Sequence, residues 1–357
     1  MKGKSKIILF YFLFPWILTH GSNMVAYSQK TTNINVNIDK ASWISHHDLN
    51  TFSVLNSFEF ILGGINNVCY DSNIGILIHS MNDLYLFDTN LNQIRTKYSN
   101  PGRREHEYIS FMDFGIENNL IYILDRNSNK IIWFNPNGAF NHIDNIVNNF
   151  SSKPFCSITR INEHSYVGKR VYTGMPTEGL SLYDNQYKYV CDLGSGIIRR
   201  SGITMHRNLY RSENDEILYN DYFSHEILSI CPDNCYIKYI VNFGKYNIPD
   251  PSKFTDEYEI IDQINNDNEL SATLISNIYE SDQYLSFSCL IEEKGKGLII
   301  YNKNSQKTNT FIVSDKDFIV LQIVPTINSI YIFMEDKDGE IYVGTFNYEQ
   351  SMVPDTN

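Results

Sequence analysis

Six short β-type runs recur along the chain, and each ends in an aromatic or small apolar residue followed by a turn residue. Successive ends, counted from Phe87, are 47, 49, 48, 70 and 45 residues apart. A period in the forties with strand-rich units is typical of a propeller whose blades each hold about four strands. The sequence therefore predicts an all-β fold, a six-bladed β-propeller with four-stranded antiparallel blades. The runs end at Phe87–Asp88, Phe134–Asn135, Tyr183–Asp184, Cys231 to Asp233, Tyr301–Asn302 and Phe346–Asn347.

Composition and turn chemistry support this reading. The chain has 25 Tyr and 21 Phe, residue types that favour the half-buried surface of a strand. Asn135-Pro136-Asn137-Gly138 predicts a hairpin turn, because proline presets φ and glycine accepts positive φ. A ring must also be closed, and the alternating run Ile34 to Ile38 is the segment we expect to join the last sheet.

The N-terminus predicts an export signal. Lys2, Lys4 and Lys6 precede an apolar run over residues 7–18, and small residues stand before Ser28. We expect a signal peptide of residues 1–28 and a propeller domain of residues 29–357. The run is shorter than the roughly 20 residues that span a bilayer, although a retained membrane anchor is the alternative. The first cysteine is Cys69, so no lipoprotein cysteine stands at the cleavage site, and we expect a soluble, periplasmic or extracellular product.

The formal net charge is −12 and becomes −15 once the three lysines of the signal are removed. Such a balance repels nucleic acid and anionic lipid, and we expect neither as a partner. One closed ring of blades favours a single domain, which we expect to be a monomer.

The interval between the fourth and fifth runs is too long, and the excess falls at about residues 246–272. This insertion is acidic and rich in asparagine. It is either a solvated surface loop or a lid over a binding face.

The segment from Leu84 to Phe140 resembles a family of secreted six-bladed β-propellers from Gram-negative anaerobes, distant relatives of the NHL-repeat propellers. The resemblance implies a fold and a location in the cell envelope, without an established reaction. Many members look like lipoproteins, which this chain does not. The matching residues are 84–88, 102–108, 113–116, 121–125, Phe134, Asn137 and Gly138.

The connector between the first two blades departs from the family pattern of Gly, basic, Gly, Pro, Gly, Glu, Tyr. Its centre is replaced by Arg104, Glu105 and His106. A guanidinium can grip a carboxylate bidentately and a tyrosine can stack on a sugar, so this loop is a candidate binding site. Alternatively, the loop is only pinned to the next blade and its arginines are solvated. The candidate binding residues are Arg103, Arg104, Glu107 and Tyr108.

Cys231 and Cys235 flank a predicted hairpin turn in the fourth blade. Three intervening residues permit the Cα separation of about 5.5 Å that a disulfide prefers, so we expect the two side chains to face each other. Two free thiols are the alternative.

The sequence lacks the common motifs of metal, cofactor and catalytic sites. The histidines and cysteines lack the paired spacing of a zinc site, and residues 336–339 suit a hairpin turn better than a calcium loop. No glycine-rich phosphate loop or Gly-x-Ser-x-Gly elbow is present. We therefore expect no metal and no cofactor.

Two functions follow from the sequence. The first is an exported binding module of the cell envelope that presents loops to a glycan, a peptide or an envelope protein. The second is a hydrolase or lyase with carboxylates or histidines at the central funnel. The first is favoured, because the sequence shows no recognisable set of catalytic residues and the fold alone does not specify a reaction.

Overall fold

The computed structural model describes the greater part of the chain. It covers residues 31–55, 64–80, 83–91, 93–98, 101–102, 104–109, 111–125, 128–146, 155–170, 179–193, 208–221, 224–232, 234–249, 259, 262–263 and 271–348. The chain divides into Met1–Lys30 and Thr31–Asn357, and every described residue belongs to the second unit. The predicted signal peptide and most of the predicted insertion lie outside the described residues, so both stay predictions.

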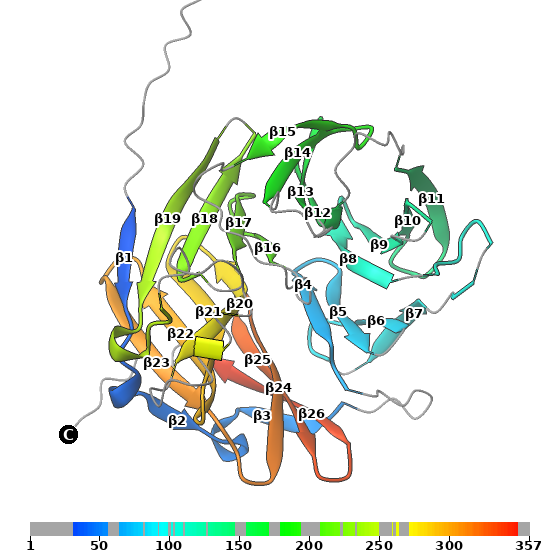
Figure 1. Cartoon of the computed structure of the whole chain (residues 1–357). Coiled ribbons are helices and arrows are strands. Elements are labelled where there is room, and N and C mark those ends of the chain that lie inside the picture. Colours follow the sequence, from blue (N-terminus) through cyan, green and yellow to red (C-terminus); the bar gives the residue numbers. More distant parts are fainter. Residues whose placement is uncertain are drawn as a thin grey trace, which may run out of the picture. The chain divides into compact units, whose positions relative to one another are not determined.

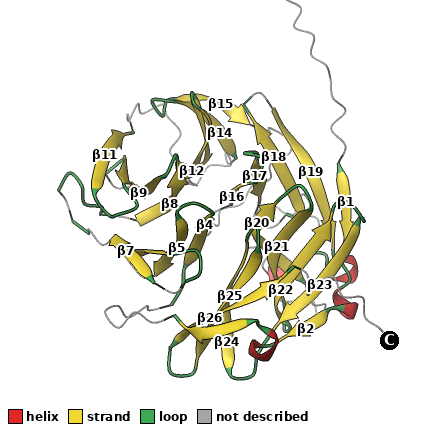
Figure 2. Ribbon diagram, turned by 180° about the vertical axis from the view of Figure 1, so that it is seen from behind, coloured by secondary structure: helices red, strands yellow, loops and turns green. Residues whose placement is uncertain are grey.

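Six mainly antiparallel sheets follow one another along the second unit (Figures 1 and 2). Five contain four consecutive strands joined in order, and two of these five carry a further strand from the N-terminal part at one edge. The sixth combines three consecutive strands with one from the N-terminal part. The predicted all-β, six-bladed architecture with four-stranded blades is thus confirmed. The blades are β4 (Asn67–Asp71) to β7 (Ile94–Tyr98), with β5 (Gly75–Ser80) and β6 (Asp83–Phe87); β8 (Phe111–Glu117) to β11 (Phe140–Asn145), with β9 (Leu120–Asp125) and β10 (Lys130–Phe134); β12 (Phe155–Asn162) to β15 (Tyr189–Leu193), with β13 (Ser165–Arg170) and β14 (Leu180–Asp184); β16 (Leu209–Arg211) to β19 (Asn234–Asn242), with β17 (Ile217–Asn220) and β18 (Glu226–Cys231); β20 (Ala272–Glu280) to β23 (Lys307–Val313), with β21 (Tyr284–Ile291) and β22 (Gly295–Asn302); and β24 (Phe318–Pro325), β25 (Ser329–Asp336) and β26 (Ile341–Asn347) with β3 (Thr51–Val54).

The second blade shows how local sequence makes a sheet. The backbone N–H of Asn135 donates to the oxygen of Ala139 at 2.8 Å, and that of Gly138 donates to Asn135 at 2.9 Å. Gly138 has a φ of 86°, which a residue with a Cβ adopts at a cost. The turn predicted from Pro136 and Gly138 is confirmed, and it fixes the register of β10 against β11.

The blades form a closed ring. Each first strand contacts the first strand of the next blade, from β4 through β8, β12, β16, β20 and β24 back to β4. Among the described residues, six clusters of buried apolar side chains lie between neighbouring sheets, one at each junction between two blades. Burial of these side chains between flat faces is the main force that holds one blade to the next.

The N-terminal part fastens the outer rim of three blades. β1 (Thr32–Asn35) pairs in parallel with β19, β2 (Ser42–Ile44) pairs in parallel with β23, and β3 pairs antiparallel with β26. Short 3₁₀ turns at Ile38–Lys40 and His46–Asp48 connect these strands. Figure 1 shows β1 beside β19 at the edge of the ring.

The prediction that Ile34 to Ile38 joins the last sheet is therefore wrong. Ile34 pairs with Val241 in the fourth blade and is completely buried between that blade and the fifth. The alternating pattern correctly indicates burial, but it does not specify which sheet provides the partner. β3 closes the ring instead, since it directly precedes the first blade in the chain.

An ionic network joins the fourth and fifth blades. Glu280 is 3% exposed and accepts Lys238 Nζ at 2.9 Å, Lys303 Nζ at 2.6 Å and the Tyr239 hydroxyl. Lys238 also pairs with Glu216. Burial alone would raise the pKa of Glu216, but hydrogen bonds from Lys238 and Ser229 outweigh it and hold the pKa below its usual range. The network thus links β19 of the fourth blade to β20 of the fifth and to the residue after β22, and its charged groups are all paired.

A substitution at Gly344 tests whether the pairing of β3 with β26 closes the ring. A Cβ at this position would overlap the side chain of Leu49 and lie 2.9 Å from the backbone oxygen of Thr51. We expect Gly344→Ala to destabilise the protein by about 1–3 kcal/mol, because it crowds β3 against β26. Chemical denaturation measures this loss. Thr345→Ala removes only an exposed hydroxyl contact to Thr51 and should change stability by less than about 0.5 kcal/mol. Equal losses in both variants would show that β3 does not close the ring tightly.

Glu280 tests the network between the blades. We expect Glu280→Gln to cost about 3 kcal/mol, because it takes the buried carboxylate away from Lys303 and leaves Lys238 paired with Glu216 alone. The matched control is Asp317→Asn, which removes an exposed 4.0 Å pair with Lys316 and should cost less than about 0.5 kcal/mol. Unfolding in urea compares the two variants, and a loss no larger than that of the control would contradict the assignment.

Candidate functional site

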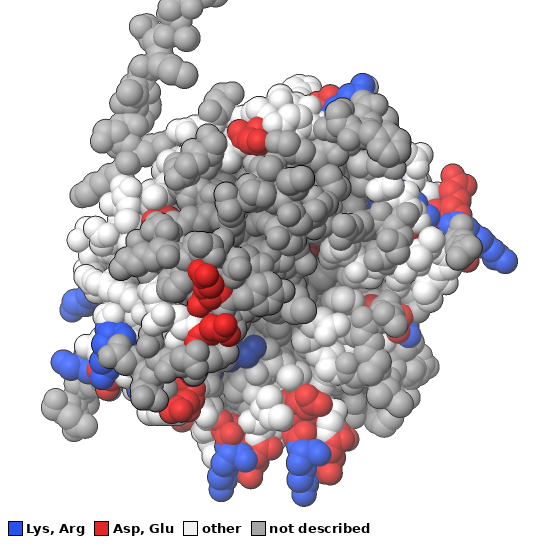
Figure 3. Space-filling view, viewed as in Figure 1, with Lys and Arg blue, Asp and Glu red and all other residues white. Residues whose placement is uncertain are grey.

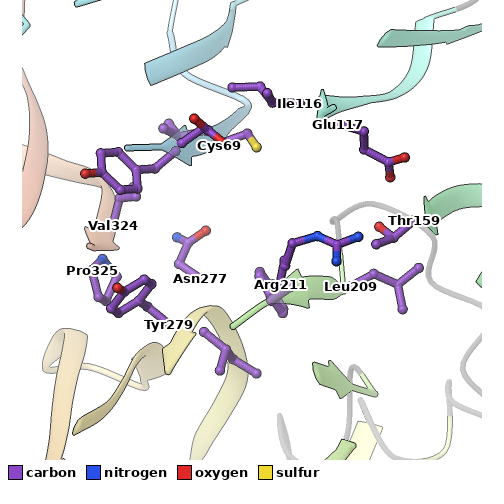
Figure 4. A pocket seen from close by; sticks show the side chains of 15 residues that line it. Cys69, Ile116, Glu117, Thr159, Leu209, Arg211, Asn277, Tyr279, Val324 and Pro325 are labelled. Carbon is purple, nitrogen blue, oxygen red and sulfur yellow. The ribbon is translucent and has the colours of Figure 1, made fainter. Parts of the chain in front are cut away.

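The first strands of the six blades line a channel along the axis of the ring. Its middle part, the central cavity, has a volume of about 130 Å³. In Figure 4 the labelled side chains extend from separate strands toward this common space. Each of the six first strands contributes, with Cys69 on β4, Glu117 on β8, Thr159 on β12, Arg211 on β16, Asn277 on β20 and Pro325 on β24.

A second cavity opens where the first strands end. This arginine cavity has a volume of about 390 Å³ and shares Asp71, Glu117 and Arg211 with the central cavity. Its described charged residues are two arginines and four acids. They are Arg160, Arg211, Asp71, Glu117, Glu163 and Asp215.

The two arginines come from neighbouring blades and are held together. Arg211 Nη2 donates to the backbone oxygen of Arg160, and Arg211 Nη1 lies 3.5 Å from Asp215 Oδ1. Arg160 Nε donates to the oxygen of Asn162 at 2.9 Å. Since a guanidinium carries five N–H donors, these contacts position both groups and leave donors for a ligand.

Two acids of the arginine cavity also organise backbone. Asp71 Oδ1 accepts the N–H groups of Asn73 and Ile74, each at 2.9 Å, which fixes the turn after β4. Glu117 Oε1 accepts the N–H of Arg160 at 2.8 Å and so ties the second blade to the third. Beside them the hydroxyl of Thr159 is buried and has no hydrogen-bond partner among the described residues. A buried polar group without a partner costs stability, which a ligand at this point would recover.

A third cavity lies toward the other end of the channel. This lysine cavity has a volume of about 140 Å³ and shares Tyr210 and Asn277 with the central cavity. Lys296 on β22 reaches across to the sixth blade, where its Nζ donates to the backbone oxygen of Leu321. Burial lowers the pKa of this lysine. The three cavities thus follow one another along the axis.

The charged side chains on one face of the molecule are mixed. Figure 3 shows described basic and acidic groups side by side at the rim, without a continuous patch of one sign among them. The described part of the chain contains no helix long and apolar enough to cross a membrane. Within the same residues, no three His, Cys, Asp or Glu side chains are grouped as ligands for a metal ion.

The residues of the predicted connector site differ in their exposure to solvent. Arg103 lies outside the described residues. Arg104 is exposed, and its backbone N–H donates to Glu107 Oε2 at 2.8 Å. Tyr108 is 2% exposed and packs edge-on against Phe111 in the core between the first two blades, so its expected stacking on a ligand is wrong. Lys130 Nζ anchors the loop through the oxygens of Arg104 and Glu105. A role for Arg104 in binding stays a prediction.

The expected facing of Cys231 and Cys235 is wrong as well. Cys231 pairs with Asn234 across the hairpin, and Cys235 pairs with Ile230. Neighbouring positions of a ladder point to opposite faces, so the two thiols are directed apart and both are free. The turn is one residue shorter than the sequence suggested, which shifts the register.

Sequence reasoning missed the residues that line the axis, although the repeat contained a signal for them. The last residues of the first strands recur with nearly the same spacing as the ends of the hairpin runs. They are Asp71, Glu117, Asn162, Arg211, Glu280 and Pro325. Four of them, Asp71, Glu117, Asn162 and Arg211, are polar and line the arginine cavity. Polar residues at this repeated position predict the rim of a channel.

Comparisons with known proteins agree with the architecture. A sequence model of the family DUF5128, described as a 6-bladed beta-propeller, matches residues 31–326. A solved structure from Bacteroides fragilis, of a protein predicted to be exported, is similar with a TM-score of 0.67 and 13% identity over 89% of this chain and 99% of that chain. A member of the DUF4221 family from Bacteroides vulgatus has a TM-score of 0.55 and 11% identity over 84% and 97% of the two chains. At these identities the likeness shows the fold alone. A comparison of the sequence with curated proteins found no match.

The thiols provide a test of the fourth hairpin. We expect Cys231 and Cys235 to remain unlinked in the unreduced protein, because their side chains lie on opposite faces of the ladder. Burial raises the pKa of Cys235 to about 12, so this thiol should react far more slowly than the exposed Cys191. Alkylation followed by peptide mapping measures both properties. Recovery of a peptide with Cys231 joined to Cys235 would contradict the register.

Proposed function

We propose that this chain, which belongs to the six-bladed β-propeller family DUF5128, is an exported binding module of the cell envelope. The module holds a small polar ligand in its axial channel. The observation that carries the proposal is the row of three cavities along the axis, to which all six blades contribute. The arginine cavity alone has the size of a small-molecule site, for which 300–1,000 Å³ is typical.

The walls of the channel suit binding without rearrangement. Its side chains stand on paired strands whose outer faces are packed against neighbouring blades. A site on such a scaffold is preformed, so little entropy is lost when a ligand binds. Tyr70 and Tyr279 line the central cavity and offer aromatic surface, while Arg211 and Glu117 offer charges of both signs. A glycan or a peptide fragment of the envelope matches this combination.

Location in the envelope is supported by two observations. The N-terminal sequence has the charge and length pattern of an export signal. The structurally similar protein of Bacteroides fragilis is likewise predicted to be exported. We therefore propose that the ligand is met in the periplasm or outside the cell.

Cys69 allows the channel to be blocked chemically. Its thiol borders the central cavity, whereas Cys156, Cys235 and Cys289 are buried. The test uses a Cys191→Ser, Cys231→Ser variant and any peptidoglycan fragment or oligosaccharide that binds it. We expect alkylation of Cys69 with a bulky maleimide to lower the affinity for that ligand at least tenfold. Calorimetry before and after alkylation measures the change.

The control is the same protein with Cys69→Ser, which should bind equally well with and without the maleimide. Full alkylation of Cys69 with unchanged affinity would place the ligand outside the channel. A melting temperature that stays constant on alkylation shows that the blades remain intact.

A further inference from the structure

The lysine cavity contains a cation whose charge no described residue neutralises. Lys296 stands on β22 and pairs with Leu290 and Val313 in its own sheet. Its ammonium donates to the backbone oxygen of Leu321 in the sixth blade, and it has no ion pair with any described carboxylate. Two half-buried lysines at the junction of the fourth and fifth blades differ, since Lys238 and Lys303 both pair with Glu280. A desolvated ammonium without a counter-ion is costly, which a bound anion would relieve.

The remaining described lining of this cavity is uncharged and combines polar with apolar side chains. Ser276 and Ser288 lie on paired strands with their hydroxyl oxygens 3.0 Å apart, and Ser288 also donates to the Ser276 carbonyl at 3.1 Å. Asn67 accepts the N–H of Val68 with its Oδ1, so its amide NH₂ group is a further donor at the cavity. None of the described lining residues is an acid. The cavity therefore combines one positive charge with hydroxyl and amide donors.

We propose that the lysine cavity binds a carboxylate, with Lys296 as its counter-ion and Ser276 and Asn67 as hydrogen-bond donors. This inference rests on the proposed function and names the chemical class of the ligand that the channel takes, a carboxylic acid of small size or a larger ligand with a terminal carboxylate. A single ammonium matches a singly charged anion, whereas a phosphate dianion would leave a buried charge unpaired.

The size of the cavity limits the group that enters it. A volume of about 140 Å³ is close to that of an engineered protein cavity, of about 150 Å³, that holds benzene. A carboxylate with a ring or a short chain fills it. Because Tyr210 and Asn277 also border the central cavity, a longer ligand extends from here toward Arg211 and the acids at the other end. The two ends thus differ in charge, one with a lone lysine and the other with acids in excess of arginines.

The test compares acids with neutral amides of the same shape on the mature full-length protein. The probes are benzoate and benzamide, with propionate and propionamide as a smaller pair, measured by calorimetry and by the shift in melting temperature. We expect benzoate to bind and benzamide to bind at least tenfold more weakly. Lys296→Met preserves the length of the side chain, and we expect it to lose at least tenfold in benzoate affinity while its own melting temperature stays equal or rises. Lys296→Arg should keep most of the affinity.

Lys316→Met is the matched control, since Lys316 is 86% exposed and lies away from the cavity. It should bind benzoate as the wild type does. Equal binding of acid and amide, undiminished binding by Lys296→Met, or stronger binding of methyl phosphate than of benzoate would each overturn the carboxylate assignment. If benzoate fails but alkylation of Cys69 still blocks an envelope fragment, this inference fails and the proposed function stands. If benzoate binds through Lys296 and alkylation blocks no fragment, the carboxylate site stands without the proposed role.

Discussion

The pairing of β3 with β26 is the constraint on which the rest of the ring depends. The last repeat provides only three strands, and Thr51–Val54 adds the fourth from the other end of the chain. Backbone hydrogen bonds extend the pairing beyond both ends of β3, from Asn50 to Thr345 at 2.8 Å and from Leu55 to Ile341 at 2.7 Å. Without it β26 would be an open edge, and the apolar cluster between the first and last blades would lose Leu55. The channel keeps its six walls only while this junction is closed.

Features of the fold that depend on neighbouring residues could be read from the sequence. Alternation of apolar side chains and turn residues such as Pro136 and Gly138 act within about ten residues, and the repeat then determines the number of blades. The sheet that Ile34 joins could not be predicted from the sequence, because this side chain is buried equally well at any sheet whose edge is free. Its pairing with Val241 depends on the arrangement of the whole ring.

The candidate site was less accessible to sequence reasoning for the same reason. Tyr108 belongs to a motif that departs from its family, yet its side chain is part of the core between two blades. Glu117 and Arg211 stand at the repeated ends of first strands, so the period could have identified them. Lys296 had no such signal. Its significance arises from a carbonyl on another blade and from the neutral residues around it, which only the folded ring brings together.

The N-terminal strands at the outer rim affect the order in which the parts of this protein fold. Thr31 bonds to Ile237 and Thr51 to Thr345, contacts that span 206 and 294 residues. Contacts of such long range are formed late and slowly. The first three blades have all their strands within consecutive stretches of chain and can assemble as they are synthesised, whereas the N-terminal strands β1, β2 and β3 must wait for the fourth, fifth and sixth blades. A chain shortened at its C-terminus therefore loses more than the deleted strands, because β3, which is made early, then has no β26 to pair with.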